Sequence, residues 1–188
     1  MAFGVLALQG DFEAHLRALR AVGVVAREVR RVAQLDGLRG LVLPGGESTT
    51  LLRLMEDEPW FDALRAFHAR GGALFGTCAG AILLASEVVP RQRSLGLLDA
   101  TIERNAYGRQ RDSFEEEVDV PTAGGRLRAA FIRAPRFVAT GPKAEVLATR
   151  GPHHEPVLLR QDRILAGTFH PEIAGEDRLH RMFVALAA

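Results

Sequence analysis

Cys78 is the only cysteine in the 188-residue sequence, and its neighbours place it where a nucleophile is expected. Residues 73–80 read ALFGTCAG, so an apolar strand ends and a helix of small residues begins at the thiol. A sharp strand-to-helix turn lifts a side chain above the edge of a sheet. The positive end of the helix dipole then favours the thiolate, which is the reactive form. The alternative is a buried, inert cysteine, because free cysteine packs well as a small apolar residue.

A histidine and a glutamate that could serve this thiol lie near the end of the chain. Residues 164–172 read ILAGTFHPE, a short apolar strand that ends at His170 and is followed by Glu172. Residues two apart in an extended segment point the same way, and Pro171 stiffens the spacing between them. Glu172 can therefore orient one ring nitrogen of His170 while the other faces Cys78, which predicts a catalytic triad. The alternative is a histidine at a strand end beside a solvated glutamate.

A glycine-rich loop supplies the third part of the predicted site. Residues 41–50 read LVLPGGESTT, a strand followed by a Gly-Gly turn and the start of a helix. Glycine lets the backbone bring its N–H groups close to a ligand. Acyl chemistry at a thiol needs N–H donors for the developing oxyanion, and we expect them from Gly46 and Ala79. The alternative is an ordinary loop in which Ser48 or Thr49 caps the helix.

These three segments resemble the class I glutamine amidotransferases, which combine a glycine-rich oxyanion loop, a G-x-C-x-G elbow and a late H-x-E motif. Here the motifs are PGGES, GTCAG and HPE, at residues 44–48, 76–80 and 170–172. Further strings along the whole chain resemble the glutaminase subunit of pyridoxal 5′-phosphate synthase more closely. They are LALQG, LPGGESTT, FGTCAG, ERNAYGRQ, DSFE and FIRAP, at residues 6–10, 43–50, 75–80, 103–110, 112–115 and 131–135.

The resemblance implies an activity and a partner. Cys78, His170 and Glu172 would hydrolyse L-glutamine to L-glutamate and ammonia. The ammonia would pass to a (β/α)₈ synthase subunit that makes pyridoxal 5′-phosphate, in a large hetero-oligomer. Gln9, just after the first strand, is expected at that junction. The glutaminase would need no cofactor and no metal.

The resemblance also singles out residues for glutamine recognition. Planar guanidinium groups match a carboxylate bidentately, so Arg104 and Arg133 are expected to bind the α-carboxylate. The alternative for each arginine is a surface salt bridge. Four further residues are expected to line the same pocket, namely Gly46, Glu47, Ser48 and Ile132.

The pattern of apolar residues predicts an α/β fold in which strands and helices alternate. The resemblance makes this a flavodoxin-like three-layer glutaminase domain spanning 1–188, with a mainly parallel central sheet, helices on both faces and an added antiparallel β segment. Strands are expected at 3–8, 24–29, 41–43, 73–75 and 164–169, and helices at 12–22, 51–55, 60–67 and 177–186. Closely spaced turn residues between 95 and 165 predict antiparallel strands that cover one side of the sheet.

Composition narrows the classes of function. Apolar residues make up 47% and charged residues 25% of the chain, and the net charge is +1. This balance gives no electrostatic reason to expect nucleic acid or an anionic lipid surface as a partner. No apolar run approaches the roughly 20 residues of a membrane span, and the N-terminus has no basic signal-peptide region. A single reactive cysteine suits a reducing compartment, so the cytoplasm is expected.

Three other interpretations stay open. A glutaminase could feed a different synthase, such as one for histidine or purines, although the 103–110 string argues against this. A peptidase or stress protein could use the same architecture, but it has no reason to carry both HPE and GGES. The chain could also be an inactive subunit that only scaffolds a synthase, but the intact triad argues against this.

Overall fold

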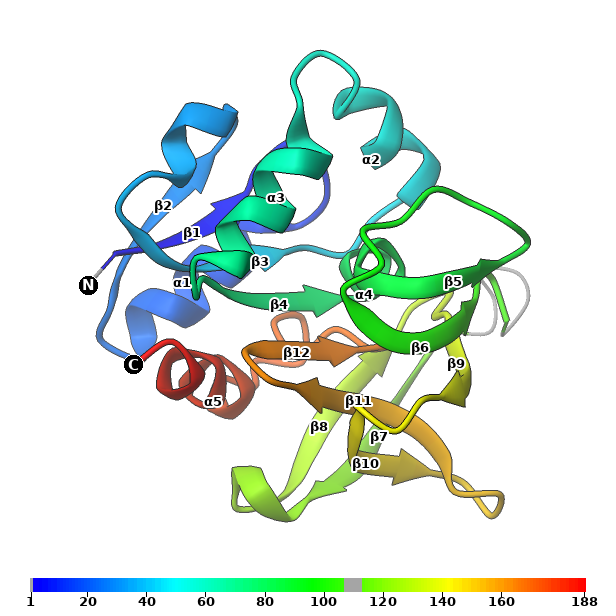
Figure 1. Ribbon diagram of the computed structural model, residues 1–188. Helices are drawn as coiled ribbons and strands as arrows, with labels where there is room; N and C mark the ends of the chain where they lie inside the picture. Colours follow the sequence, from blue (N-terminus) through cyan, green and yellow to red (C-terminus); the bar gives the residue numbers. More distant parts are fainter. Residues whose placement is uncertain (1, 107–112) are drawn as a thin grey trace.

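The computed structural model describes residues 2–106 and 113–188 and is built around one seven-stranded sheet (Figure 1). Residues 107–110 and 112 of the strings noted above lie outside the described part. The strand order is β10-β11-β12-β4-β3-β1-β2. Five neighbouring strands are parallel: β1 (Ala2–Leu6), β2 (Val25–Val29), β3 (Leu38–Leu43), β4 (Ala73–Thr77) and β12 (Ile164–Gly167). Antiparallel β11 (Glu155–Gln161) and β10 (Glu145–Arg150) extend the sheet beyond β12.

Two hydrophobic cores lie on opposite faces of this sheet, because successive side chains of a strand point to opposite faces. Leu41 and Leu43 of β3 enter one core, whereas Val42 between them enters the other. Both faces are therefore buried, which explains why these strands read as continuous apolar runs. The first core packs under α2 (Ser48–Leu54), α3 (Trp60–Ala69) and α4 (Ala79–Leu84), and the second under α1 (Phe12–Ala21) and α5 (Arg178–Leu186).

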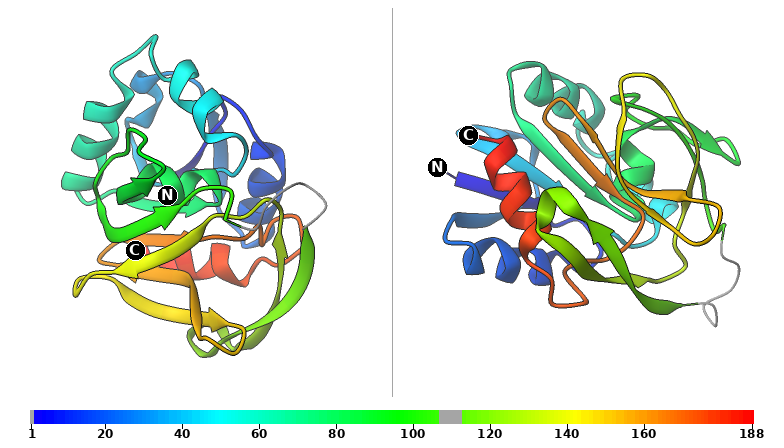
Figure 2. Two further views of the ribbon diagram at one scale, coloured as in Figure 1. Left: turned by 90° about the vertical axis from the view of Figure 1, so that its right-hand side faces the viewer. Right: turned by 90° about the horizontal axis from the view of Figure 1, so that it is seen from below.

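The views in Figure 2 show these layers from two further sides. Helices on both faces of a mainly parallel sheet confirm the predicted fold class. The helix expected at 12–22 ends at Ala21, and Gly23 follows with a φ of 85°. Every helix in the described residues is too short or too polar to cross a lipid bilayer.

The strands between 95 and 165 pair with one another antiparallel, as expected, but they do not all cover one side of the sheet. The hairpin β7 (Phe114–Val120) and β8 (Gly125–Phe131) covers the core of α1 and α5. A second sheet of β5 (Ala85–Val89), β6 (Leu98–Glu103) and β9 (Arg136–Thr140) covers the opposite core. Within it β5 and β6 are parallel, because residues 90–97 return alongside α4 before β6 begins. Turn residues mark where the chain reverses, but they do not identify the strand that each segment pairs with.

The turn between β4 and α4 is a strained elbow that only small residues can build. Cys78 adopts φ 49° and ψ −105°, a backbone conformation that residues other than glycine rarely enter. A Cβ at Gly76 would lie 2.6 Å from the Gly80 backbone, and a Cβ at Gly80 would lie 1.9 Å from the Leu43 carbonyl oxygen. The two glycines that flank the cysteine thus let α4 approach β4 and β3 closely.

We predict that Gly80→Ala lowers the free energy of unfolding by about 1–3 kcal/mol, because the new methyl group must push α4 away from β3. The measurement is urea unfolding followed by circular dichroism. Gly167→Ala is the control, since a Cβ there would meet Leu158 Cδ1 at an ordinary 3.6 Å. Equal stability losses in the two variants would contradict the close approach of α4 to β3.

Candidate active site

A cleft of about 320 Å³ opens where β3, β4 and β12 end. It contains every residue predicted for the site except Ala79, which follows Cys78, and Glu172, which lies behind His170. The predicted residues that line it are Gly46, Glu47, Ser48, Cys78, Arg104, Ile132, Arg133 and His170. Gly45, Asp11, Ile82, Asn105 and Ile173 line the cleft as well and had not been singled out for the site pocket.

Cys78 and His170 come together because β4 and β12 are neighbours in the sheet. Thr77 pairs with Gly167 in the parallel register, and the Cys78 N–H donates to the Gly167 carbonyl oxygen at 2.9 Å. His170 lies three residues beyond Gly167, and its own N–H donates to the Ala130 carbonyl oxygen at 2.8 Å. The elbow and the histidine are thus both fixed to the end of one strand.

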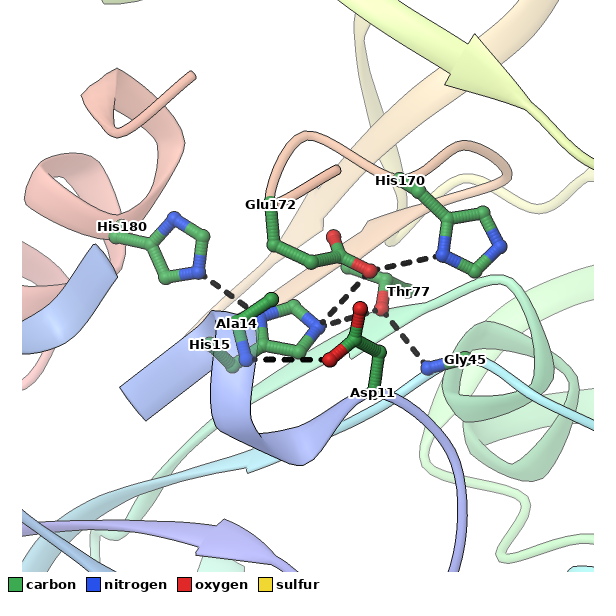
Figure 3. Close-up of polar contacts among 8 residues, drawn as sticks. All are labelled: Asp11, Ala14, His15, Gly45, Thr77, His170, Glu172 and His180. Atoms are coloured by element: carbon green, nitrogen blue, oxygen red, sulfur yellow. Dashed lines mark hydrogen bonds and ion pairs between the residues drawn. The ribbon is translucent and has the colours of Figure 1, made fainter. Parts of the chain in front are cut away.

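His170 and Glu172 form the pair that the HPE motif predicted. The Nδ1 atom of His170 lies 2.8 Å from Glu172 Oε1, and both residues are buried (Figure 3). The ring lies against the glycine-rich loop, where a Cβ at Gly45 would stand only 2.2 Å from His170 Cε1. A glycine at position 45 therefore makes room for the imidazole.

The charges of this cluster stabilise one another. Burial disfavours the imidazolium of His170, but hydrogen bonds and charges from Cys78 and Glu172 outweigh it and raise the pKa of His170 from 6.5 to about 10. Burial also disfavours the carboxylate of Glu172, yet His15 and His170 hold its pKa well below the usual range. An imidazolium beside an ionised glutamate and a sulfur atom is the arrangement that keeps a cysteine nucleophile ready for attack.

The glycine-rich loop is held by the segment that follows β1. The Glu47 N–H donates to Gln9 Oε1 at 3.1 Å, and a Cβ at Gly46 would lie 2.3 Å from the same atom. Gly46 has a φ of 139°, which L side chains rarely adopt. Substituents at both Gly45 and Gly46 are therefore excluded by neighbouring side chains.

The residue that caps α2 differs from the alternative considered for this loop. Ser48 or Thr49 was expected as the cap, but α2 begins at Ser48 and its cap is Glu47, whose carboxylate accepts from the Thr50 N–H at 2.7 Å. Hydrogen bonds, first from the Thr49 hydroxyl and then from the Thr49 and Thr50 backbone, lower the pKa of Glu47 to about 2. The ionised carboxylate also faces Arg104, whose NH2 atom lies 3.8 Å from Glu47 Oε1.

Three buried side chains behind the triad were missed by the sequence analysis. His15, Thr77 and His180 are fully buried (Figure 3). His15 and Thr77 join the Glu172 carboxylate to the loop, and His180 contacts His15. The missed signal is a histidine at position 15 on the apolar face of the predicted helix 12–22, between Phe12 and Leu19. A polar ring on a buried face needs polar partners, and the triad supplies them here.

Comparisons with known proteins agree with the resemblance inferred from the sequence motifs. Residues 5–187 match the model of the SNO glutamine amidotransferase family. The chain is 51% identical to the protein named pyridoxal 5′-phosphate synthase subunit PdxT of Deinococcus radiodurans, covering 100% of this chain and 97% of the relative. It is also 51% identical to the protein of that name from Thermus thermophilus, covering 98% and 96%.

Solved structures agree with the sequence relatives. A crystal structure of a glutamine amidotransferase superposes with a TM-score of 0.91 at 50% identity, covering 98% of both chains. A putative GMP synthase subunit from Thermoplasma acidophilum shares the fold, with a TM-score of 0.72 at 18% identity. The resemblance read from the three sequence motifs is confirmed, and the chain belongs to the SNO glutamine amidotransferase family.

Proposed function

We propose that residues 1–188 act as one domain, the glutaminase subunit of a pyridoxal 5′-phosphate synthase. It hydrolyses L-glutamine to L-glutamate and ammonia, and the ammonia serves the synthesis of vitamin B6. The observation that carries this proposal is a thiol on a strained elbow beside His170, whose ring is held by Glu172 at 2.8 Å. Family membership and the names of the relatives support it.

In the first half of the reaction the Cys78 thiolate attacks the side-chain amide carbon of glutamine. The carbonyl π electrons move to the oxygen, where N–H groups of Gly46 and Ala79 stabilise the oxyanion, at about 3–4 kcal/mol for each donor. As the carbonyl re-forms, the C–N bond breaks and His170 gives its proton to the departing nitrogen. Ammonia leaves, and a thioester joins the glutamyl group to Cys78.

The second half returns the enzyme to its starting state. His170, now neutral, takes a proton from a water molecule whose oxygen attacks the thioester carbon. The same N–H donors stabilise the second oxyanion, and its collapse breaks the C–S bond. Glutamate leaves while Cys78 recovers its thiolate and His170 its proton. Glu172 stays ionised throughout and fixes the ring orientation through Nδ1.

Glutamine recognition is assigned to the opposite wall of the cleft. Arg104, whose side chain is 15% exposed, presents a guanidinium group that suits the α-carboxylate, and Arg133 adds a second cation. The Glu47 carboxylate next to Arg104 accepts hydrogen bonds from the α-ammonium group. Ser48 and Ile132 complete the wall, and the cleft volume suits a small amino acid.

The synthase subunit is the partner that uses the ammonia. In bulk water ammonia would take up a proton and lose its nucleophilicity, so we place the (β/α)₈ subunit over the mouth of the cleft in a hetero-oligomer. Gln9 remains the predicted contact at that junction, and Ile173, 43% exposed beside the cleft, offers an apolar one. A biosynthetic enzyme with a free reactive thiol is assigned to the cytoplasm.

Cys78→Ser tests the proposed function directly. We expect the purified complex of this chain and the synthase subunit to release glutamate from glutamine. The Cys78→Ser complex should lose on the order of 10⁴-fold or more in kcat, because triad members act as a unit. Thermal unfolding and binding of the synthase subunit serve as controls and should not change. Glutamine hydrolysis near the wild-type rate in this variant would rule out Cys78 as the nucleophile.

Arg104→Ala is predicted to raise the KM for glutamine about 10- to 100-fold, with little change in kcat. An increase of this size corresponds to the binding free energy lost with one charge-assisted hydrogen bond. The α-carboxylate is remote from the reacting carbon, so its contact is the same in the ground and transition states. Arg136→Ala, which removes an exposed pair with Glu103, is the matched control. A lowered kcat at unchanged KM would instead place Arg104 in the catalytic apparatus.

The raised pKa of His170 predicts a pH-dependent contribution to stability. The folded protein binds this proton more tightly than the unfolded chain, so the contribution is complete below pH 6.5 and is lost as the pH rises toward about 10. We expect the difference in unfolding free energy between wild type and His170→Asn to narrow over that range in urea titrations. A difference that stays constant or widens with pH would contradict the ion pair.

A further inference from the structure

His15 is the one residue of the cluster behind the site that touches both halves of the proposed machinery. Its Nε2 atom lies 3.4 Å from Glu172 Oε1 and 3.1 Å from Thr77 Oγ1. Thr77 Oγ1 in turn accepts the Gly45 N–H at 3.1 Å. A continuous polar chain thus runs from His170 through Glu172, His15 and Thr77 to the glycine-rich loop (Figure 3).

The chemistry of these contacts determines what His15 can do. An ionised carboxylate only accepts hydrogen bonds, so the Nε2 atom that faces Glu172 must carry hydrogen to be attracted to it. The Nδ1 atom lies 2.9 Å from His180 Nε2. Burial lowers the pKa of His180 to about 3, so that ring is neutral. His15 is therefore anchored on one side and acts on Glu172 and Thr77 from the other.

We propose that His15 is a positioning residue for glutamine hydrolysis, and that it couples the orienting acid to the oxyanion loop. On the Glu172 side it shares Oε1 with His170 and so fixes the carboxylate that orients the catalytic ring. On the Thr77 side it fixes the hydroxyl that holds the Gly45 N–H. This inference rests on the proposed function. It adds to that function a residue that does not contact the substrate.

A second contact from the same segment supports the coupling to the loop. Gln9 accepts the Glu47 N–H, and a Cβ at Gly10 would lie 1.9 Å from the Gly45 carbonyl oxygen. Residues 9–15 thus reach the loop from Gly45 to Glu47 at two places, directly through Gln9 and indirectly from His15 through Thr77. A shift of His15 would therefore act both on Glu172 and on the loop that carries Gly46.

The test compares two polar substitutions of His15 in the complex with the synthase subunit. In His15→Gln the amide nitrogen reaches the position of Nε2 and keeps the contacts to Glu172 and Thr77. In His15→Asn the shorter amide reaches only the position of Nδ1 and keeps the contact to His180. We expect His15→Gln to retain most of the activity and His15→Asn to lose about 10- to 100-fold in kcat at a nearly unchanged KM, as for a small misplacement of catalytic groups.

Two further variants separate positioning from packing. Thr77→Val removes the hydroxyl of the same link, so the His15→Asn/Thr77→Val double variant should lose less than the product of the two single losses. Leu64→Ala removes a fully buried side chain of α3, in the core on the other face of the sheet from α1 and α5. It should lower the thermal unfolding temperature while kcat stays close to that of the wild type.

The possible outcomes are distinct. Equal loss of kcat in His15→Gln and His15→Asn would overturn the positioning role. Losses of kcat that follow the drop in unfolding temperature in all variants, including Leu64→Ala, would overturn it too. Wild-type kcat in His15→Asn would overturn it as well. Failure of the wild-type complex to hydrolyse glutamine would overturn the proposed function itself, which is a different result from hydrolysis that His15 does not affect.

Discussion

The pairing of β4 with β12 is the interaction on which the rest of the site depends. It joins segments about 90 residues apart in the sequence, with Thr77 opposite Gly167. Parallel strands end at the same edge of a sheet. The residues just past these two ends, Cys78 and His170, are therefore brought together by the strand pairing itself. The hydrogen bond from the Cys78 N–H to the Gly167 carbonyl then closes the edge at 2.9 Å.

Once the strands have fixed this edge, backbone atoms must approach one another more closely than side chains allow. The glycines at positions 10, 45, 46, 76 and 80 each occupy a place where a Cβ would come within 1.9–2.6 Å of a neighbouring atom. The gain is that the glycine-rich loop and the thiol line one cleft, where we propose that N–H groups of the loop and of α4 act on an oxyanion. The strain at Cys78 is the remaining cost, and the packing of α4 against β3 and β4 holds it in place.

The sequence predicts those parts of the fold and the site that local patterns encode. Apolar runs that end in Gly, Cys or His locate the strand ends, and the three motifs locate the residues that line the cleft. The small sheet of β5, β6 and β9 could not be predicted, because its pairing depends on partners that turn residues do not specify. Glu47 as the cap of α2 was missed, since a glutamate is not a favoured cap. His15 was missed because a helical pattern identifies a buried face but not a polar neighbour on it.

The missed histidine also explains how a buried carboxylate can remain charged. Burying an ion is unfavourable unless a partner compensates its charge, and Glu172 has only 1% of its side chain exposed. His170 alone could supply one contact, but in the proposed mechanism that ring gives up its proton and then attracts the carboxylate less. His15 lies outside the path of the proton, so its contact with Oε1 persists through both protonation states of His170. In the proposed mechanism a second imidazole therefore keeps Glu172 ionised and oriented when the first is neutral, at the moment when the thioester must be hydrolysed.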